Sequence, residues 1–351
     1  MGFKRVRFNN FKNIEPREMQ WFPGLNLITG ENGAGKTNIL EGMNILSGWG
    51  PLERGTKAKT LPNWESGAAD VPLTGELETN EIIRVKVSTR TTIKVDEKSA
   101  TASALRQKVP ALTFLPEDMS IVEGSAQYRR RLIDMLLAII IPSYAFHISE
   151  FRRGIKQKTE FLKRGIPSLI ADKTILPHAA WIWKMRHEGV KLLSICLEET
   201  EELAPAKITL TLKRGGGGYC DNFEDDYVKA VTINREREEA IKFPLVGPHR
   251  DDIIISSEGR TASEAFSRGL RRRTAAALIL AASEGVRRKT GINPILLLDE
   301  VTAELDAHGR ELLFDALTKR NTQVFAATAE PFEGEFPGTV YRVSGGKLAK
   351  I

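Results

Sequence analysis

Short apolar runs alternate with polar turns over residues 1–112, a pattern typical of strands arranged around one helix. The predicted strands lie at 3–11, 25–30, 73–77, 82–88 and 91–95, and the predicted helix lies at 35–47. Glycine, proline and basic residues between 48 and 70 predict a long loop. The region has the pattern of one half of an α/β sheet domain.

After Gln127 the apolar residues follow the period of a helix. Tyr144, Ile148, Phe151 and Leu162 recur at helical spacing, and the glycine and proline at 165 and 167 end that helix. A second long helix is predicted at 178–203, with Pro205 as its stop. Residues 113–204 are therefore predicted to form a helical lobe.

Strand character returns at 207–213, and a helix rich in alanine and arginine is predicted at about 263–290. Strand-like segments follow at 294–298, 322–327 and 339–343, separated by a helix. The runs at 295–298 and 324–327 lack alternation, as expected of parallel strands buried on both faces. The sequence thus predicts an α/β fold in which a mixed sheet lobe (1–112 and 205–351) carries the inserted helical lobe 113–204, with the 263–290 helix packing toward that lobe.

The net charge indicates which class of binding partner to expect. The 351 residues carry a formal net charge of +6, which favours a polyanion such as nucleic acid, although many basic enzymes have no such partner. No apolar stretch reaches the roughly 18 residues needed to span a membrane, and no apolar signal region follows Lys4, so a cytoplasmic protein without a membrane partner is expected. Cys196 and Cys220 are too few for a disulfide framework or a zinc site.

The strongest chemical signal is a complete phosphate-loop motif between the predicted strand at 25–30 and the helix that follows. The motif is Gly30, Glu31, Asn32, Gly33, Ala34, Gly35, Lys36 and Thr37. Its glycines let backbone N–H groups surround the β-phosphate, Lys36 reaches the β- and γ-phosphate oxygens, and the Thr37 hydroxyl holds Mg²⁺. The sequence therefore predicts binding of a nucleoside triphosphate.

The apolar run at 295–298 ends in two adjacent carboxylates, as a Walker B strand does. Asp299 is predicted to hold the Mg²⁺ shell, and Glu300 to polarise the water that attacks the γ-phosphate. A buried carboxylate without a task is costly unless it is paired, which argues against a purely structural role.

Three further segments point to the ABC-type ATPases. Ser267 and Gly269 give the S-x-G core of a signature motif, residues 303–306 stand at the spacing of a D-loop that ends in Asp306, and Thr328 ends the next strand as a switch residue. In this class two heads enclose ATP, and the signature serine, glycine amide and helix amino end of one copy contact the γ-phosphate held by the other.

Nearly the whole chain resembles the RecF family of recombination mediators, relatives of the SMC and double-strand-break-repair ATPase heads. The matching segments are Asn10-Phe11-Lys12-Asn13, the phosphate loop, Phe114-Leu115-Pro116-Glu117-Asp118, residues 129–134, residues 153–163, Gly247-Pro248-His249-Arg250-Asp251-Asp252, the signature, and residues 297–306. The sequence departs from the family at Leu270, where glutamine is usual, and at Glu300, where aspartate is more usual.

The resemblance implies an ABC-type ATPase head that binds ATP with Mg²⁺, hydrolyses it slowly in a DNA-dependent way and forms an ATP-dependent homodimer. It further implies binding to duplex, gapped or single-stranded DNA, and, with RecO and RecR, assistance to recombinase loading in gap repair and the SOS response. Lys12 and Asn13 would then lie near the nucleotide, and basic residues of the inserted lobe near DNA.

Several alternatives stay open at this point. A transporter's nucleotide-binding subunit would carry a clear glutamine before the helical lobe, an SMC-type structural protein would need a longer insertion than 119–205, and an ATP-gated DNA-binding switch could have vestigial hydrolysis. Six basic residues of the first long helix form a candidate DNA-binding surface, called the candidate DNA track: Arg152, Arg153, Lys156, Lys158, Lys163 and Arg164. The alternative interpretation of these residues is a solvent-exposed helix face without a partner. The arginines at 129–131 bind DNA phosphates or, as we favour, pair with Glu117, Asp118 and Asp134.

Overall fold

The apolar runs of the two sequence halves meet in one six-stranded sheet, ordered β15-β14-β3-β13-β12-β8. Its strands are β3 (Leu25–Thr29), β8 (Ala111–Phe114), β12 (Ile295–Asp299), β13 (Val324–Thr328), β14 (Thr339–Ser344) and β15 (Lys347–Lys350). All neighbouring strands are parallel except β14 and β15. The computed structural model describes residues 2–15, 18–52, 58–204, 207–300, 305–329 and 336–351.

A second sheet covers one face of the parallel sheet. It is antiparallel, and its strands in spatial order are β2 (Glu18–Gln20), β1 (Phe3–Phe8), β4 (Val71–Leu77), β5 (Ile82–Val87), β6 (Thr92–Val95) and β7 (Lys98–Ser99). Helix α1 (Lys36–Leu46) lies between the two sheets, where Ile39 and Met43 join one apolar core with Phe8 of β1 and Leu297 of β12. Helix α2 (Ala102–Lys108) precedes β8.

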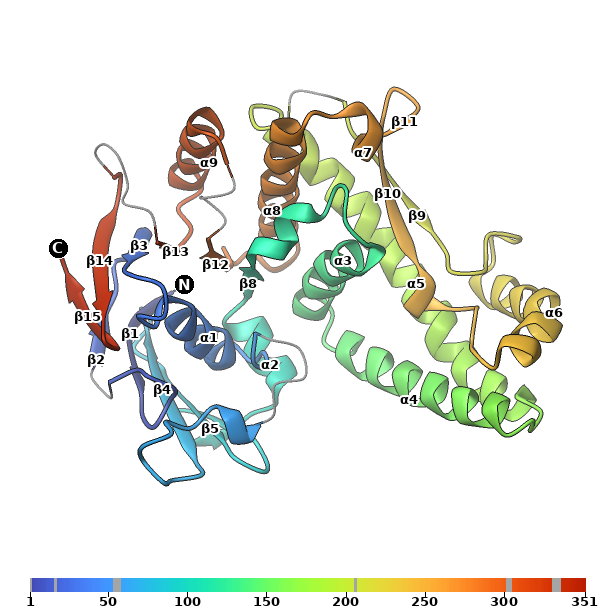
Figure 1. Cartoon of the computed structure of the whole chain (residues 1–351), viewed down its shortest axis with the longest axis horizontal. Coiled ribbons are helices and arrows are strands. Elements are labelled where there is room, and N and C mark those ends of the chain that lie inside the picture. Colours follow the sequence, from blue (N-terminus) through green and yellow to red (C-terminus); the bar gives the residue numbers. More distant parts are fainter. Residues whose placement is uncertain (1, 16–17, 53–57, 205–206, 301–304, 330–335) are drawn as a thin grey trace.

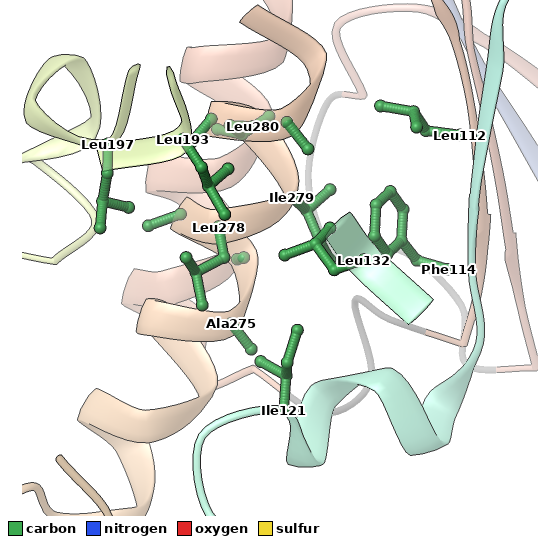
Figure 2. Packing of buried hydrophobic residues seen from close by; sticks show 14 of the residues in the cluster. Leu112, Phe114, Ile121, Leu132, Leu193, Leu197, Ala275, Leu278, Ile279 and Leu280 are labelled. Carbon is green, nitrogen blue, oxygen red and sulfur yellow. The ribbon is translucent and has the colours of Figure 1, made fainter. Parts of the chain in front are cut away.

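The other face of the parallel sheet packs on α8 (Arg268–Thr290). Alternate residues of β12 supply the two cores: Ile295 and Leu297 face α1, whereas Leu296 and Leu298 face α8. Figure 2 shows Leu278 and Leu280 of α8 close to Leu193, and Ile279 facing Leu132 and Phe114. The predicted burial of these strands on both faces is confirmed. Helix α9 (Ala307–Lys319) flanks α8 on the same side.

The second lobe is built around α3 (Ala126–Ile140), α4 (Tyr144–Lys163), α5 (Leu169–Leu197) and α6 (Phe223–Ile241) (Figure 1). It also holds a three-stranded sheet of β11 (Arg260–Thr261), β10 (Asp252–Ser257) and β9 (Thr209–Lys213), followed by α7 (Ala262–Ala265). Short 3₁₀ turns are η1 (Ala58–Thr60), η2 (Pro116–Ser120), η3 (Glu198–Thr200) and η4 (Pro248–Arg250). No helix among the described residues is long and apolar enough to cross a membrane.

The lobe boundary differs from the one expected at 205. Strands β9 and β10 do not enter the large sheets, because Leu210, Ile253 and Ile255 bury their side chains in the core shared by α3, α5 and α8. Helix α6 and strand β10 were not predicted at all. The segment 207–261 therefore belongs with the helical lobe.

Helix α5 begins nine residues earlier than expected, at Leu169 rather than His178, and runs through Pro177. A proline inside a helix removes one backbone hydrogen bond, to the carbonyl four residues earlier. Here that carbonyl belongs to Lys173, and both residues are exposed, so water can satisfy it. The expected stop at Pro205 lies outside the described residues; the helix itself ends at Leu197.

A buried lysine joins α4, α5 and α6. Lys158 is fully buried, and its Nζ lies 2.7 Å from Asp172 Oδ1 and 2.6 Å from Glu238 Oε2. Lys158 was expected in a DNA-binding track, and that prediction is wrong. Its ammonium group compensates two carboxylates that are themselves buried, so it has a structural role.

We expect Lys158→Met to lower the free energy of unfolding by about 3–5 kcal/mol, because Asp172 and Glu238 would lose their buried counterion. Lys156→Met, on the exposed face of the same helix, should change it by no more than about 0.5 kcal/mol. Urea unfolding followed by circular dichroism measures both. Equal stability of the two variants would contradict the structural role.

Candidate nucleotide-binding site

The phosphate loop turns between β3 and α1 with its backbone in a conformation that only glycine adopts readily. Gly35, the residue before α1, has φ of 115°, and a methyl group there would lie 3.0 Å from Asn13 Oδ1. Lys36 is buried, and its Nζ donates to the carbonyls of Gly30 (2.9 Å) and Glu31 (3.3 Å). The ammonium group is thus held inside the curve of the loop, and Glu31, Asn32 and Gly33 are exposed at its rim.

The register of the parallel sheet brings Asp299 to the start of α1. The Thr37 hydroxyl donates to the Asp299 carboxylate, with Oγ1 at 2.9 Å from Oδ2 and 3.1 Å from Oδ1. Asp299 is buried, and burial raises the pKa of its carboxyl, while the Thr37 hydrogen bond acts in the opposite direction. A buried carboxylate whose ionised form is disfavoured is suited to binding a cation.

These oxygens fit Mg²⁺. Mg²⁺ takes oxygen ligands and commonly binds through one or two protein groups together with substrate phosphates. The Thr37 hydroxyl and the Asp299 carboxylate form such a pair, and they are already within contact distance of each other. A Mg²⁺ ion held here would supply positive charge to the phosphates at the amino end of α1.

Glu300 follows Asp299 with a left-handed backbone, φ of 50°, which turns its side chain toward the loop. Its Oε1 lies 3.6 Å from Lys36 Nζ, and its Oε2 accepts a hydrogen bond from the Ala329 N–H at 3.2 Å. The Glu300 N–H donates to the carbonyl of Ala327, a residue of β13, and this bond attaches the backbone of Glu300 to that strand. The carboxylate is therefore held beside the phosphate loop, where a general base is needed.

The two residues expected near the nucleotide from the amino-terminal segment behave differently. Asn13 contacts the loop: its Nδ2 donates to the Gly33 carbonyl at 3.0 Å, and its Oδ1 accepts from Asn38 Nδ2 at 2.7 Å. Lys12 instead forms an ion pair with Glu41, a buried residue of α1. Lys12 therefore steadies the helix behind the loop, and its ammonium group is not directed at the phosphate site.

The turn between β14 and β15 contacts the phosphate loop, and the sequence analysis did not predict this contact. The Gly346 N–H donates to the Ala34 carbonyl at 3.2 Å, and the Gly346 carbonyl accepts from the Glu15 N–H at 3.1 Å. Gly346 has φ of 78°, and a methyl group there would collide with the Asn13 carbonyl. The adjacent Gly345-Gly346 pair was the available signal, because consecutive glycines mark tight turns.

The signature residues lie at the amino end of α8, the helix that packs on the face of the parallel sheet opposite α1. Ser267 caps the amino end of α8, where its Oγ accepts from the Leu270 N–H at 3.3 Å, and both Ser267 and Gly269 are exposed. In Figure 1 this end of α8 is at the top of the picture, away from α1. Ser267 and Gly269 therefore present their polar groups to solvent rather than to the phosphate loop of their own chain.

The end of the expected D-loop adjoins the signature. Asp306 caps α9 by accepting from the Gly309 N–H at 2.7 Å, and its Oδ2 would lie 3.8 Å from a methyl group placed on Gly269. Ala303 and Glu304 lie outside the described residues. Thr328 is buried at the end of β13 and pairs in register with Thr29, next to the phosphate loop. The structure thus separates the predicted site residues into two groups, one at the phosphate loop and one at the amino ends of α8 and α9.

The arginines at 129–131 bind within the protein, as we favoured, although only one of them uses an expected partner. Arg131 pairs with Asp118, whereas Arg129 makes two hydrogen bonds to Asp252, at 2.6 and 3.1 Å. Arg130 donates to the Asp251 carbonyl at 2.5 Å. The exposed cations of the candidate DNA track are those on α4 and just after it: Arg152, Arg153, Lys156, Lys163 and Arg164.

Comparison with known proteins identifies the relatives of the chain. The family described as RecF/RecN/SMC N terminal domain matches residues 3–334. The DNA replication and repair protein RecF of Heliobacterium modesticaldum is 28% identical, with 100% of this chain and 99% of that protein covered. RecF of Lysinibacillus sphaericus is 29% identical, with 93% of each covered.

Solved structures share the fold. A structure of the recombination mediator protein RecF with ATP, in the RecFOR pathway, has a TM-score of 0.84 at 23% identity, covering 100% of this chain and 97% of that one. A second RecF structure has a TM-score of 0.88 at 22% identity, covering 99% and 98%. An SMC head bound to the C-winged helix domain of ScpA has a TM-score of 0.58 at 16% identity and covers 100% and 98%. The predicted ABC-type α/β head is confirmed.

Asp299→Asn should stabilise the nucleotide-free protein at pH 7. Burial raises the pKa of Asp299 in the folded chain above its value of about 4 in the unfolded chain. The ionised carboxylate therefore lowers the free energy of unfolding once the pH rises above the unfolded-state pKa, and it has no such effect at lower pH, where Asp299 is protonated in both states. We expect Tm to rise by about 2–4 °C at pH 7 and the difference to vanish near pH 3.5.

Thermal unfolding between pH 3.5 and 8, without Mg²⁺ or nucleotide, measures this effect. Asp315→Asn, at an exposed position of α9, is the matched control and should show no gain. A gain for Asp299→Asn that is the same at every pH would contradict the burial argument.

Proposed function

The chain belongs to the RecF/RecN/SMC N-terminal domain family, and from this membership and the site geometry we propose that it is a RecF-like ATPase of DNA repair. In this proposal ATP with Mg²⁺ binds at the phosphate loop and joins two copies of the chain. The dimer then binds duplex, gapped or single-stranded DNA and, with partners equivalent to RecR and RecO, assists recombinase loading in gap repair and the SOS response.

The observation that carries the proposal is the separation of the candidate site residues into two groups. Lys36, Thr37 and Asp299 meet at the edge of the parallel sheet, whereas Ser267 and Gly269 are exposed at the amino end of α8. A helix amino end binds anions through its free N–H groups and dipole. A second copy related by a two-fold axis would bring its α8 to the phosphates held by the first, and the reverse, as in a closed isologous dimer.

Each residue then has a distinct task. Lys36 supplies positive charge to the β- and γ-phosphates, and Thr37 and Asp299 hold Mg²⁺. Glu300, steadied by Lys36 and the Ala329 N–H, accepts a proton from the attacking water. Asp306 orders the start of α9 beside the partner-facing signature. Asn13 and Thr328 shape the loop's surroundings.

The DNA-binding part of the proposal is supported by charge. The net charge is +6, and exposed arginines and lysines follow α4 to its end at Lys163. Arg153 and Lys163 have carboxylate neighbours one turn earlier, Glu150 at 3.1 Å and Glu160 at 3.5 Å, which are exposed enough for a phosphate to compete. Such a face binds DNA backbone without reading its sequence.

Lys36→Met should abolish ATP-dependent dimerisation, because the phosphates would lose the cation that holds them in the loop. Light scattering of the purified protein with and without ATP and Mg²⁺ measures the mass. Lys59→Met, at an exposed lysine of η1, is the control and should dimerise like the unmodified chain. A dimer of unchanged mass with Lys36→Met would refute the two-copy site.

Lys163→Gln should weaken duplex binding equally for different sequences and reduce the slope of log affinity against log salt by about one. Lys191→Gln is the control: Lys191 is also an exposed lysine paired at i,i+3, with Glu188 at 3.3 Å, but it lies on α5. Filter binding between 50 and 200 mM salt, roughly the range over which phosphate contacts are screened, compares them. A salt slope near zero for the unmodified chain would exclude backbone binding.

A further inference from the structure

A groove with a volume of about 690 Å³ runs between the two lobes, at the carboxyl end of α1. Asn44 and Trp49 line one side, and residues of α3 and the start of α4 line the other. Figure 1 shows α1 and α2 facing α3 and α4 across this joint. The phosphate loop lies at the opposite end of α1, an 11-residue helix about 16 Å long, and shares no residue with the groove.

The groove is rich in guanidinium groups. Its lining includes Arg106, Arg130, Arg131, Arg152 and Arg186. Asp134 is the one carboxylate in the lining formed by the described residues, and it already bonds Arg186 and the Tyr144 hydroxyl. Arg131 pairs with Asp118, and Arg186 pairs also with Asp251. These bonds leave Arg106, Arg130 and Arg152 without a carboxylate at ion-pair distance in the described part of the chain.

Arg106 is the clearest sign of a missing anion. It is 8% exposed, donates from Nη1 to the Gly48 carbonyl at 2.7 Å, and has no hydrogen-bond partner for Nε among the described residues. Buried polar atoms are normally satisfied, so an unsatisfied guanidinium in a cavity wall suggests a ligand with acceptor oxygens.

The same walls offer flat apolar surfaces. Arg106 lies over the Trp49 ring at 4.9 Å, and Trp49 is held in place by donating from Nε1 to the Ala111 carbonyl at 3.0 Å. Phe151 and His249 form a second aromatic pair with centroids 5.7 Å apart, but Phe151 is buried, so Trp49 is the ring that can face a base. Aromatic rings beside arginines are the combination that binds a base together with its phosphate. A purely acidic peptide would leave the rings without a function.

We propose that this interlobe groove binds one phosphate-bearing nucleotide unit, with Arg106, Arg130 and Arg152 contacting the phosphate and Trp49 stacking on the base. The unit is either a free mononucleotide or a nucleotide within a single strand. The volume suits a ligand of this size. The site is distinct from the phosphate loop and does not require two copies of the chain. The case in which the ligand is part of a nucleic-acid strand rests on the proposed DNA-binding function.

Fluorescence anisotropy with a labelled oligothymidylate of about four nucleotides tests the proposal, with every variant made in a Lys36→Met background so that the phosphate loop contributes no binding. Arg152→Gln should weaken binding about tenfold, the effect of one lost charge-assisted hydrogen bond. Lys191→Gln is the matched control, because Lys191 is an exposed cation of α5 that lies outside both the groove lining and the basic face of α4. It should change affinity less than about twofold.

A second measurement avoids dependence on one variant. Ligand binding should alter intrinsic tryptophan fluorescence of the unmodified chain, and Trp49→Phe should remove that change. Competition by thymidine monophosphate at a concentration similar to that of the oligonucleotide identifies a free nucleotide as the ligand; competition by oligonucleotides alone identifies a strand.

Equal losses for Arg152→Gln and Lys191→Gln would overturn the groove, because they would show that binding depends only on the total positive charge. Competition by polyglutamate as strong as that by nucleotide would overturn the nucleotide assignment in favour of an acidic peptide. Both results leave duplex binding by the unmodified chain intact. Loss of duplex binding itself would instead contradict the proposed function.

Discussion

The parallel pairing of β3, β13 and β12 is the constraint on which the site depends. Thr29 pairs with Thr328, and Ala327 pairs with both Ile28 and Asp299, so the three strands end at one edge of the sheet. Parallel strands place their carboxyl ends together, and that edge is where ligands bind in open α/β sheets. Because a shift of one residue would turn Asp299 to the other face, the buried side chains on both faces fix the contact between Asp299 and Thr37.

A second constraint acts in the helical lobe, where buried charges are paired beside an apolar cluster. Asp251 is fully buried and accepts hydrogen bonds from Trp183 Nε1, the Gly215 N–H and Arg186 Nη1. These bonds tie residues 247–252, one of the segments that match the RecF family, to α5. Its distinctive residues therefore serve mainly to hold the fold, and they form one wall of the interlobe groove through His249.

The parts of the fold that could be predicted were those with local signals. The phosphate loop and the run ending at Asp299 are contiguous motifs, and their strands show a burial pattern typical of parallel sheets. Helix α6 was missed because its sequence is polar nearly all round, so its signal was only the Asn222 cap and an acidic first turn. The burial of Lys158 could not be predicted, because its two carboxylates come from α5 and α6, distant in sequence. Likewise, only tertiary contact shows that Lys12 is tied to Glu41.

Helix α8 touches both lobes with some of the smallest side chains available. Ala275, Ala276, Ala277, Ala281 and Ala282 are completely buried along it. Methyl groups allow neighbouring elements to approach closely, and any larger group in a filled interior must displace them. The distance from the phosphate loop to Ser267 at the amino end of α8 therefore depends on side-chain volume in this joint. In the dimer proposed above, a single added methylene there would alter the fit of the two copies without a change to any residue that contacts the nucleotide.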